Sequence, residues 1–209
     1  MPDFHIENNL QGIVAGVDEV GRGPWAGPVT ACAAIINRQE LPSAILNLID
    51  DSKKLKKKDR EGAYTLLTNL PVKQFCYSLG YASVEEIDRI NIRQAALLAM
   101  TRAIEGLTIK PDHCLIDGNA LPTIAMPATC VIGGDDKSLS IAAASIIAKV
   151  ERDRLMLELS KDFPEYGWES NAGYGTKVHQ QAINDYGVCI HHRRSFKPIM
   201  QQLQLRLNN

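Results

Sequence analysis

One short segment near the start of the chain constrains the fold most strongly. An apolar run at residues 13–17 ends in two adjacent acids, Asp18 and Glu19, and a glycine-flanked arginine, Arg22, follows at once. Such a run predicts a buried strand, and a strand that ends in carboxylates can present them to a metal ion. Glycines beside the arginine let backbone amides approach a ligand closely. The segment therefore favours chemistry on a phosphorylated substrate.

Composition and charge narrow the class of protein. The chain has 209 residues, of which 45% are hydrophobic and 22% are charged, so it can bury one domain-sized core and is not expected to be disordered. The net charge of −1 conceals basic clusters at residues 53–60 and 191–197. Runs of lysine are usually solvated, so these clusters alone do not establish a nucleic-acid surface.

Cysteine usage and the lack of long apolar segments indicate a cellular location. The five cysteines are widely spaced and form no Cys-x-x-Cys pair, which disfavours a disulfide framework and favours a reducing compartment. The first residues do not resemble a signal peptide, and no run approaches the roughly 20 apolar residues of a membrane span. We expect a cytoplasmic protein without membrane association, and we also expect a monomer.

Strand-like and helix-like patterns alternate along the chain. Residues 83–105 begin with the capping box Ser83-x-x-Glu86, and an alanine-rich helix is predicted to start near residue 138. Only helical or loop segments follow it. Strands are predicted at residues 13–18, 29–36, 72–82, 113–117 and 129–132. This order predicts an α/β domain with one mixed sheet and a helical C-terminal part.

Acidic residues end several of these predicted elements. Asp18 and Glu19 close the first strand, Asp117 closes another, and Asp135 and Asp136 precede the alanine-rich helix. Carboxylates gathered at one sheet edge repel one another, and Mg²⁺ or Mn²⁺, which prefer oxygen ligands, relieve that repulsion. Each acid also has a structural explanation, because Asp-Gly is a common turn and an aspartate can cap a helix. Their recurrence beside glycines favours a functional cluster.

Six sequence blocks occur in order between about residue 12 and residue 198. They are Gly16-Val17-Asp18-Glu19-Val20-Gly21-Arg22-Gly23-Pro24 with Ala26-Gly27-Pro28, Asp51-Ser52-Lys53-Lys54-Leu55, Leu115-Ile116-Asp117-Gly118, Gly134-Asp135 through Arg152-Asp153, Gly173-Tyr174-Gly175-Thr176 with His179, and His192-Arg193 with Ser195-Phe196. A lone Gly-Arg-Gly motif is weak evidence, whereas six blocks in order are specific. Together they resemble the signatures of bacterial ribonuclease HII, the type 2 ribonuclease H.

The resemblance implies a fold and an activity. The expected fold is ribonuclease H-like, with a central mixed sheet flanked by helices. Residues 1–209 are expected to form one catalytic domain, in which residues 155–209 are a mainly helical extension. The expected enzyme is an endonuclease that hydrolyses the phosphodiester 5′ of ribonucleotides in RNA–DNA hybrids and of single ribonucleotides in duplex DNA. It would leave 3′-hydroxyl and 5′-phosphate ends and serve DNA replication and ribonucleotide excision repair.

The resemblance also implies which acids are catalytic. Asp18, Glu19, Asp117 and Asp135 are expected to bind two Mn²⁺ or Mg²⁺ ions. The family places its last aspartate directly after glycine, which selects Asp135. Its neighbour Asp136 is then expected to be a solvated residue or a helix cap.

Substrate contacts are implied in the same way. Gly21, Arg22 and Gly23 are expected to read the 2′-hydroxyl of the ribonucleotide, largely through backbone groups. Tyr174 is expected to stack on the sugar of the next nucleotide. From the sequence alone, a tyrosine that packs on its own domain explains Tyr174 equally well.

Three basic residues are candidate phosphate contacts. Lys53 lies in the second block, and Arg193 and Arg194 lie near the last one. Backbone contacts of this kind make binding sensitive to salt. None of the histidines is spaced as a zinc site, and Trp25 is expected to pack within the protein.

Two other classes of protein remain as alternatives. One is a different nuclease or phosphatase with a carboxylate metal site, which would cleave all-DNA duplexes as readily. The other is a non-catalytic nucleic-acid-binding module, which the adjacent Asp18 and Glu19 disfavour because acids in such a groove repel phosphate.

Overall fold

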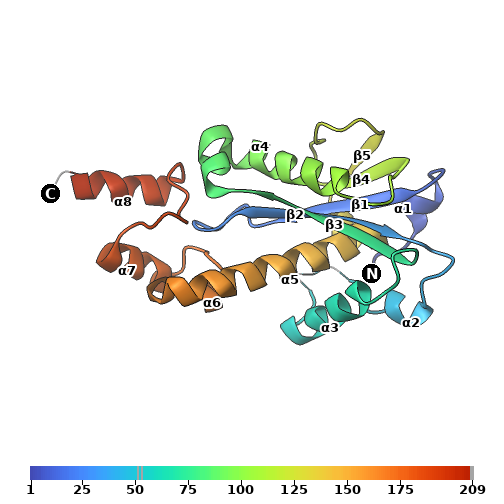
Figure 1. Ribbon diagram of the computed structural model, residues 1–209, viewed down its shortest axis with the longest axis horizontal. Helices are drawn as coiled ribbons and strands as arrows, with labels where there is room; N and C mark the ends of the chain where they lie inside the picture. Colours follow the sequence, from blue (N-terminus) through green and yellow to red (C-terminus); the bar gives the residue numbers. More distant parts are fainter. Residues whose placement is uncertain (51, 53, 208–209) are drawn as a thin grey trace. The chain divides into compact units, whose positions relative to one another are not determined.

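The computed structural model describes residues 1–50, 52 and 54–207. It contains a five-stranded sheet in the order β3-β2-β1-β4-β5 (Figure 1). The strands are β1 (Val14–Val20), β2 (Val29–Ile36), β3 (Phe75–Ala82), β4 (His113–Asp117) and β5 (Ala128–Val131). Because β1 is antiparallel to β2 and parallel to β4, the sheet is mixed. All five predicted strands are confirmed, with ends that differ by no more than three residues.

Close packing of a helix on the sheet explains the small residues around the first strand. Helix α5 (Leu139–Asp162) begins against β1, where a Cβ on Gly16 would lie 2.1 Å from the Ser140 carbonyl carbon. Only glycine permits so close an approach. β2 is buried along its whole length, as its nearly continuous apolar sequence predicts. The alanine-rich helix thus begins directly against the strand that carries Asp18.

The remaining helices are mostly short and include the predicted C-terminal helix. They are α1 (His5–Asn8), α2 (Ser43–Leu46), α3 (Lys57–Thr68), α4 (Val84–Glu105), α6 (Trp168–Asn171), α7 (Lys177–Tyr186) and α8 (Lys197–Leu207), with 3₁₀ turns η1 (Gly134–Asp136) and η2 (Pro164–Tyr166). Within the described residues, no helix is long and apolar enough to span a membrane.

Helix α4 confirms the predicted capping box but is not one regular helix. The Glu86 N–H donates to Ser83 Oγ at 3.2 Å, and the Ser83 N–H donates to the Glu86 carboxylate at 2.9 Å. The helix is interrupted at Asn91, which has φ 66° and ψ 162°. Asn91 Oδ1 accepts hydrogen bonds from the N–H groups of Arg93 and Gln94, so it caps a second helical segment. The prediction of a continuous helix was therefore wrong at this residue.

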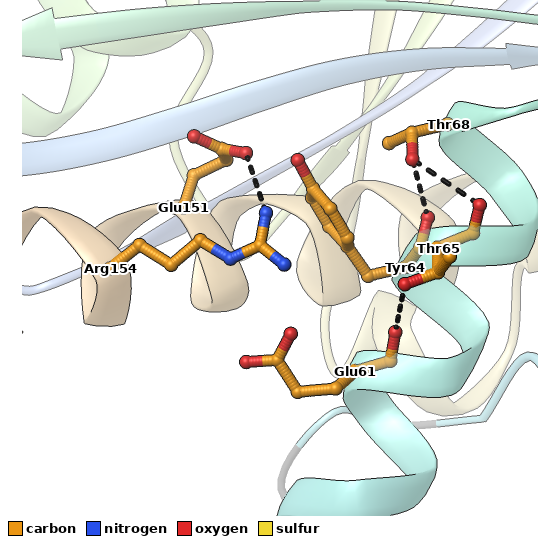
Figure 2. Close-up of polar contacts among 6 residues, drawn as sticks. All are labelled: Glu61, Tyr64, Thr65, Thr68, Glu151 and Arg154. Carbon is orange, nitrogen blue, oxygen red and sulfur yellow. Dashed lines mark hydrogen bonds and ion pairs between the residues drawn. The ribbon is translucent and has the colours of Figure 1, made fainter.

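In helix α3, which carries part of the first basic cluster, the hydroxyl groups of two threonines bond to carbonyl oxygens of the same helix (Figure 2). Thr65 Oγ1 donates to the Glu61 carbonyl at 2.9 Å, and Thr68 Oγ1 donates to the Tyr64 carbonyl at 2.9 Å. The lysines in its first turn are exposed. This part of the cluster is therefore a solvated helix face.

Contacts between residues divide the chain into two compact units. The first comprises Met1–Val20, Thr30–Tyr81 and Leu97–Val150, and the second comprises Gly21–Val29, Ala82–Ala96 and Glu151–Asn209. The second unit has an apolar core of its own, which includes Met156, Tyr166 and Trp168. It contains the predicted extension at residues 155–209 together with the loop after β1. The single-domain interpretation stays a prediction.

Candidate active site

Two parallel strands bring the first acids to one edge of the sheet. In the β1–β4 ladder, Val17 pairs with Ile116, so Asp18 and Asp117 are the next residues on adjacent strands. Asp18 is only 4% exposed, whereas Glu19 and Asp117 are half-buried. Parallel pairing therefore places a buried carboxylate beside a second one.

The acids influence one another electrostatically. Burial raises the pKa of the Asp18 carboxyl well above its usual range, and the charges of Glu19 and Asp117 raise it further. Hydrogen bonds from Ser145 and from the Glu19 N–H lower it, and the latter measures 2.7 Å to Asp18 Oδ1. The ionised form of Asp18 is therefore costly in the protein alone.

A short turn adds the fourth acid to this edge. The Gly134 N–H donates to Asp117 Oδ1 at 2.7 Å, which ties η1 to the end of β4. A Cβ on Gly134 would lie 2.5 Å from Ile141 Cδ1 and 3.2 Å from Asp117 Oδ1, so the close packing of the turn favours glycine. Asp135, the next residue, is 5% exposed. We call Asp18, Glu19, Asp117 and Asp135 the carboxylate edge.

The neighbouring aspartates of η1 differ in surroundings. Asp136 is exposed and forms an ion pair with Lys54. Asp135 is buried in the same unit as Asp18 and Asp117. This difference favours Asp135 over Asp136 as a metal ligand, as the family pattern implies.

The carboxylate edge suits a hard divalent cation in its chemistry. Its donors are all carboxylate oxygens, Asp18 and Asp135 are buried, and the charges of Glu19 and Asp117 oppose ionisation of Asp18. Within residues 1–50, 52 and 54–207, however, no three acidic, histidine or cysteine side chains are already arranged as a metal site. The edge thus holds acids close together without a finished coordination geometry, and its ligand assignment stays a prediction.

The loop after β1 lies beside the predicted stacking tyrosine within the second unit. We call residues 21–28 the glycine loop. A Cβ on Gly23 would lie 3.5 Å from Tyr174 Cε1, which is an ordinary contact, and the Tyr174 side chain is 44% exposed. The Trp25 N–H donates to the Gly173 carbonyl at 2.8 Å, and the Trp25 ring fills the space beside Gly175. The packing role predicted for Trp25 is confirmed.

The candidate phosphate contacts have different outcomes. Arg193 is fully buried and donates to backbone carbonyls of the glycine loop, so its interpretation as a surface phosphate contact was wrong. Arg194 is exposed and stays a candidate. Lys53 lies outside the described residues.

Two buried histidines hold the segment that carries Tyr174, a role that the sequence did not suggest. His179 Nδ1 lies 2.9 Å from the Tyr174 carbonyl oxygen, so Nδ1 carries the proton. His179 Nε2 then accepts from Trp168 Nε1 at 3.2 Å and from His192 Nε2 at 3.0 Å. Burial, and then the nearby His179, lower the pKa of His192 to about 3, so both rings are neutral at pH 7.

Comparisons with known proteins show the family of this chain. The family model of ribonuclease HII matches residues 15–199. A ribonuclease HII of Jannaschia sp. (strain CCS1) is 56% identical over 204 residues, which cover 97% of this chain and 98% of that protein. The crystal structure of ribonuclease H2 from Pyrococcus horikoshii OT3 is similar with a TM-score of 0.78 and 25% identity, over 94% of this chain and 100% of that one.

A more distant structure shares the fold. Bst-RNase HIII, solved in complex with Mn²⁺, has a TM-score of 0.74 and 18% identity, over 94% of this chain and 71% of that one. The predicted ribonuclease H-like α/β fold is thereby confirmed. The chain belongs to the ribonuclease HII family of ribonuclease H endonucleases.

Proposed function

We propose that this protein hydrolyses the phosphodiester 5′ of ribonucleotides, both in RNA–DNA hybrids and at single ribonucleotides in duplex DNA, and leaves 3′-hydroxyl and 5′-phosphate ends. One observation supports this most strongly: buried Asp18 adjoins Glu19 and Asp117 on paired parallel strands. Such a concentration of negative charge disfavours binding of a phosphodiester unless cations are bound first. The site therefore suits metal-dependent hydrolysis.

The four acids of the carboxylate edge would hold two Mn²⁺ or Mg²⁺ ions. Bound ions would supply an activated water and stabilise the leaving oxygen. Asp18 and Asp117 hold fixed positions because their strands are paired, while the Gly134 N–H fixes one oxygen of Asp117. The Mn²⁺ complex of the similar Bst-RNase HIII supports the choice of metal.

The glycine loop and Tyr174 would read the substrate. Gly21, Arg22 and Gly23 would contact the 2′-hydroxyl, which distinguishes RNA from DNA. The exposed Tyr174 ring beside Gly23 would stack on the following sugar and favour an RNA–DNA junction. We further propose that residues 1–209 act as one catalytic domain, as a cytoplasmic monomer, in DNA replication and ribonucleotide excision repair.

The test is a cleavage assay on a DNA duplex that contains one ribonucleotide, with the cut position mapped. With Mg²⁺ or Mn²⁺ we expect a single cut 5′ of the ribonucleotide, and with excess chelator we expect none. Equal cleavage of an all-DNA duplex would instead indicate a different nuclease. Tight binding without metal-dependent turnover would indicate a non-catalytic binding module.

A further inference from the structure

Two arginines lie under the glycine loop and are wholly buried. Arg152 comes from α5 and Arg193 from the segment before α8, and both are 0% exposed. Both belong to the same compact unit as the loop and Tyr174. A buried guanidinium is costly unless its donors are bonded, so the partners of these two side chains indicate what they do.

Backbone carbonyls of the glycine loop are their main partners. Arg193 makes four hydrogen bonds of 2.5–3.2 Å, to the carbonyl oxygens of Gly21, Arg22, Gly27 and Pro28. One guanidinium therefore joins the beginning of the loop to its end. Because the guanidinium group is a planar, rigid fork of N–H donors, it fixes the relative positions of these carbonyls more tightly than the flexible ammonium group of a lysine could.

Arg152 connects the loop to the segment that carries Tyr174. Its Nε donates to the Pro28 carbonyl at 3.1 Å and its Nη2 to the Ala26 carbonyl at 3.1 Å. Its Nη1 donates to the Ala172 carbonyl, two residues before Tyr174, at 3.0 Å. This single side chain thus sets the separation between the glycine loop and the tyrosine.

The glycines of the loop fit this arrangement. A Cβ on Gly21 would lie 2.2 Å from Arg152 Nε, and Gly21 has φ +92°. A Cβ on Gly23 would meet only Tyr174, at 3.5 Å. Gly21 is therefore required by the buried arginine as well as by its backbone conformation, whereas Gly23 leaves its open side for a ligand.

Two buried positive charges next to each other reduce the stability of a fold. Burial, and then the charge of Arg152, lower the pKa of Arg193 to about 9, while burial lowers the pKa of Arg152 to about 10. Both guanidiniums are therefore still charged at pH 7. An apolar pair of the same volume is often at least as stabilising, so geometry is the better explanation for their presence.

We propose that Arg152 and Arg193 are positioning residues that set substrate discrimination by holding the glycine loop and Tyr174 at a fixed separation. This inference rests on the proposed function, in which those two elements read adjacent nucleotides. The arginines contact no substrate themselves.

Arg152→Lys and Arg193→Lys test the proposal, because lysine keeps the positive charge and loses the fork. Arg154→Lys is the matched control: Arg154 lies on the same helix, is exposed, and forms an ion pair with Glu151 at 3.8 Å (Figure 2). The readout is the ratio of kcat/KM for a single-ribonucleotide duplex to kcat/KM for an RNA–DNA hybrid. Misplacement by about 1 Å can reduce a rate by up to ~10²-fold, so we expect Arg152→Lys to lower the ratio at least tenfold.

Arg193→Lys should lower kcat/KM on both substrates, and the control should match the wild type. A folded Arg152→Lys protein whose ratio stays within twofold of the wild type would overturn the proposal. Circular dichroism melting curves establish that each variant is folded.

A second measurement needs no variant and does not depend on catalysis. Hydrogen–deuterium exchange of the free wild-type protein should show slow exchange at the Trp25 and Gly27 amides, which donate to the Gly173 and His191 carbonyls. Fast exchange that slows only when duplex is added would mean that substrate, not the arginines, orders the loop. If the wild type cleaves neither duplex, the proposed function fails, and the exchange data still decide whether the loop is held in advance.

Discussion

The glycine loop directly follows Asp18 and Glu19 of the carboxylate edge in sequence, but the two regions have opposite charges to accommodate. The edge gathers negative side chains, and its most buried member, Asp18, is costly to ionise. The loop lies over the buried positive charges of Arg152 and Arg193. These two side chains donate seven hydrogen bonds, all of them to carbonyl oxygens. In the proposed function the edge is completed by a cation, whereas the loop is already hydrogen-bonded to the two arginines in the protein alone.

The largest effect on activity is expected from replacing acids of the carboxylate edge. Asp135→Asn or Asp117→Asn should reduce cleavage of a single-ribonucleotide duplex by on the order of 10³-fold, because a metal contributes several kcal/mol to the transition state. Asp136→Asn is the matched control, since Asp136 is exposed and paired with Lys54. Near-normal turnover of Asp135→Asn in single-turnover kinetics, with a loss in Asp136→Asn, would reverse the assignment.

Replacing Gly21 and Gly23 one at a time tests the side of the loop that faces the buried arginine and the side that faces Tyr174. Gly21→Ala should lower the free energy of unfolding by about 3 kcal/mol, because φ is positive there and the new methyl meets Arg152. Gly23→Ala should change it by less than about 0.5 kcal/mol, since its Cβ makes an ordinary contact. Urea denaturation measures both values. Similar losses in the two variants would show that the loop is not held from beneath.

Tyr174 tests whether the loop region reads the sugar next to the ribonucleotide. Tyr174→Ala should lower the preference for a single ribonucleotide over a continuous hybrid by about tenfold, taking as a scale the roughly 1–3 kcal/mol that one base contributes when it stacks on an aromatic ring. Tyr174→Phe keeps the ring and should keep the preference. Competition assays with both duplexes give the ratio directly, and an unchanged ratio in Tyr174→Ala would refute the stacking role.

A modest effect on stability is expected at Asp18. Its pKa is raised in the folded protein, so its favourable contribution is complete below the unfolded pKa of about 3.9 and is lost as the pH rises through the folded value. In metal-free buffer at pH 7, Asp18→Asn should therefore raise Tm by about 2–4 °C, corresponding to ~1 kcal/mol. The difference should shrink towards pH 4. Scanning calorimetry at both pH values checks the sign of the change in Tm. A Tm of Asp18→Asn below that of the wild type at pH 7 would contradict the prediction.

The strands, and the position of Asp117 at the end of one of them, were predictable because they follow local rules. Each strand is a short apolar run, and Asp117 ends such a run where the chain turns at a glycine with φ +101°. The break in α4 was not predictable, because Asn91 occurs within a segment of helical spacing and only its φ reveals the cap.

The sequence-based prediction differed most from the structure at the buried residue Arg193. Arg193 lies in a run of basic residues and resembles a solvated side chain, yet it is fully buried. Its partners are backbone carbonyls more than 160 residues away, which no local pattern can show. The roles of His179 and His192 were missed for a different reason: their partners are only 5, 11 and 13 residues away, but no sequence pattern pairs these rings.

Calorimetric titration of the protein with Mn²⁺ tests whether the carboxylate edge binds a cation. We expect the wild type and Asp136→Asn to bind Mn²⁺ alike, and Asp18→Asn, Asp117→Asn and Asp135→Asn each to bind it at least tenfold more weakly. Wild-type affinity in Asp18→Asn and Asp135→Asn would contradict a cation site at the carboxylate edge.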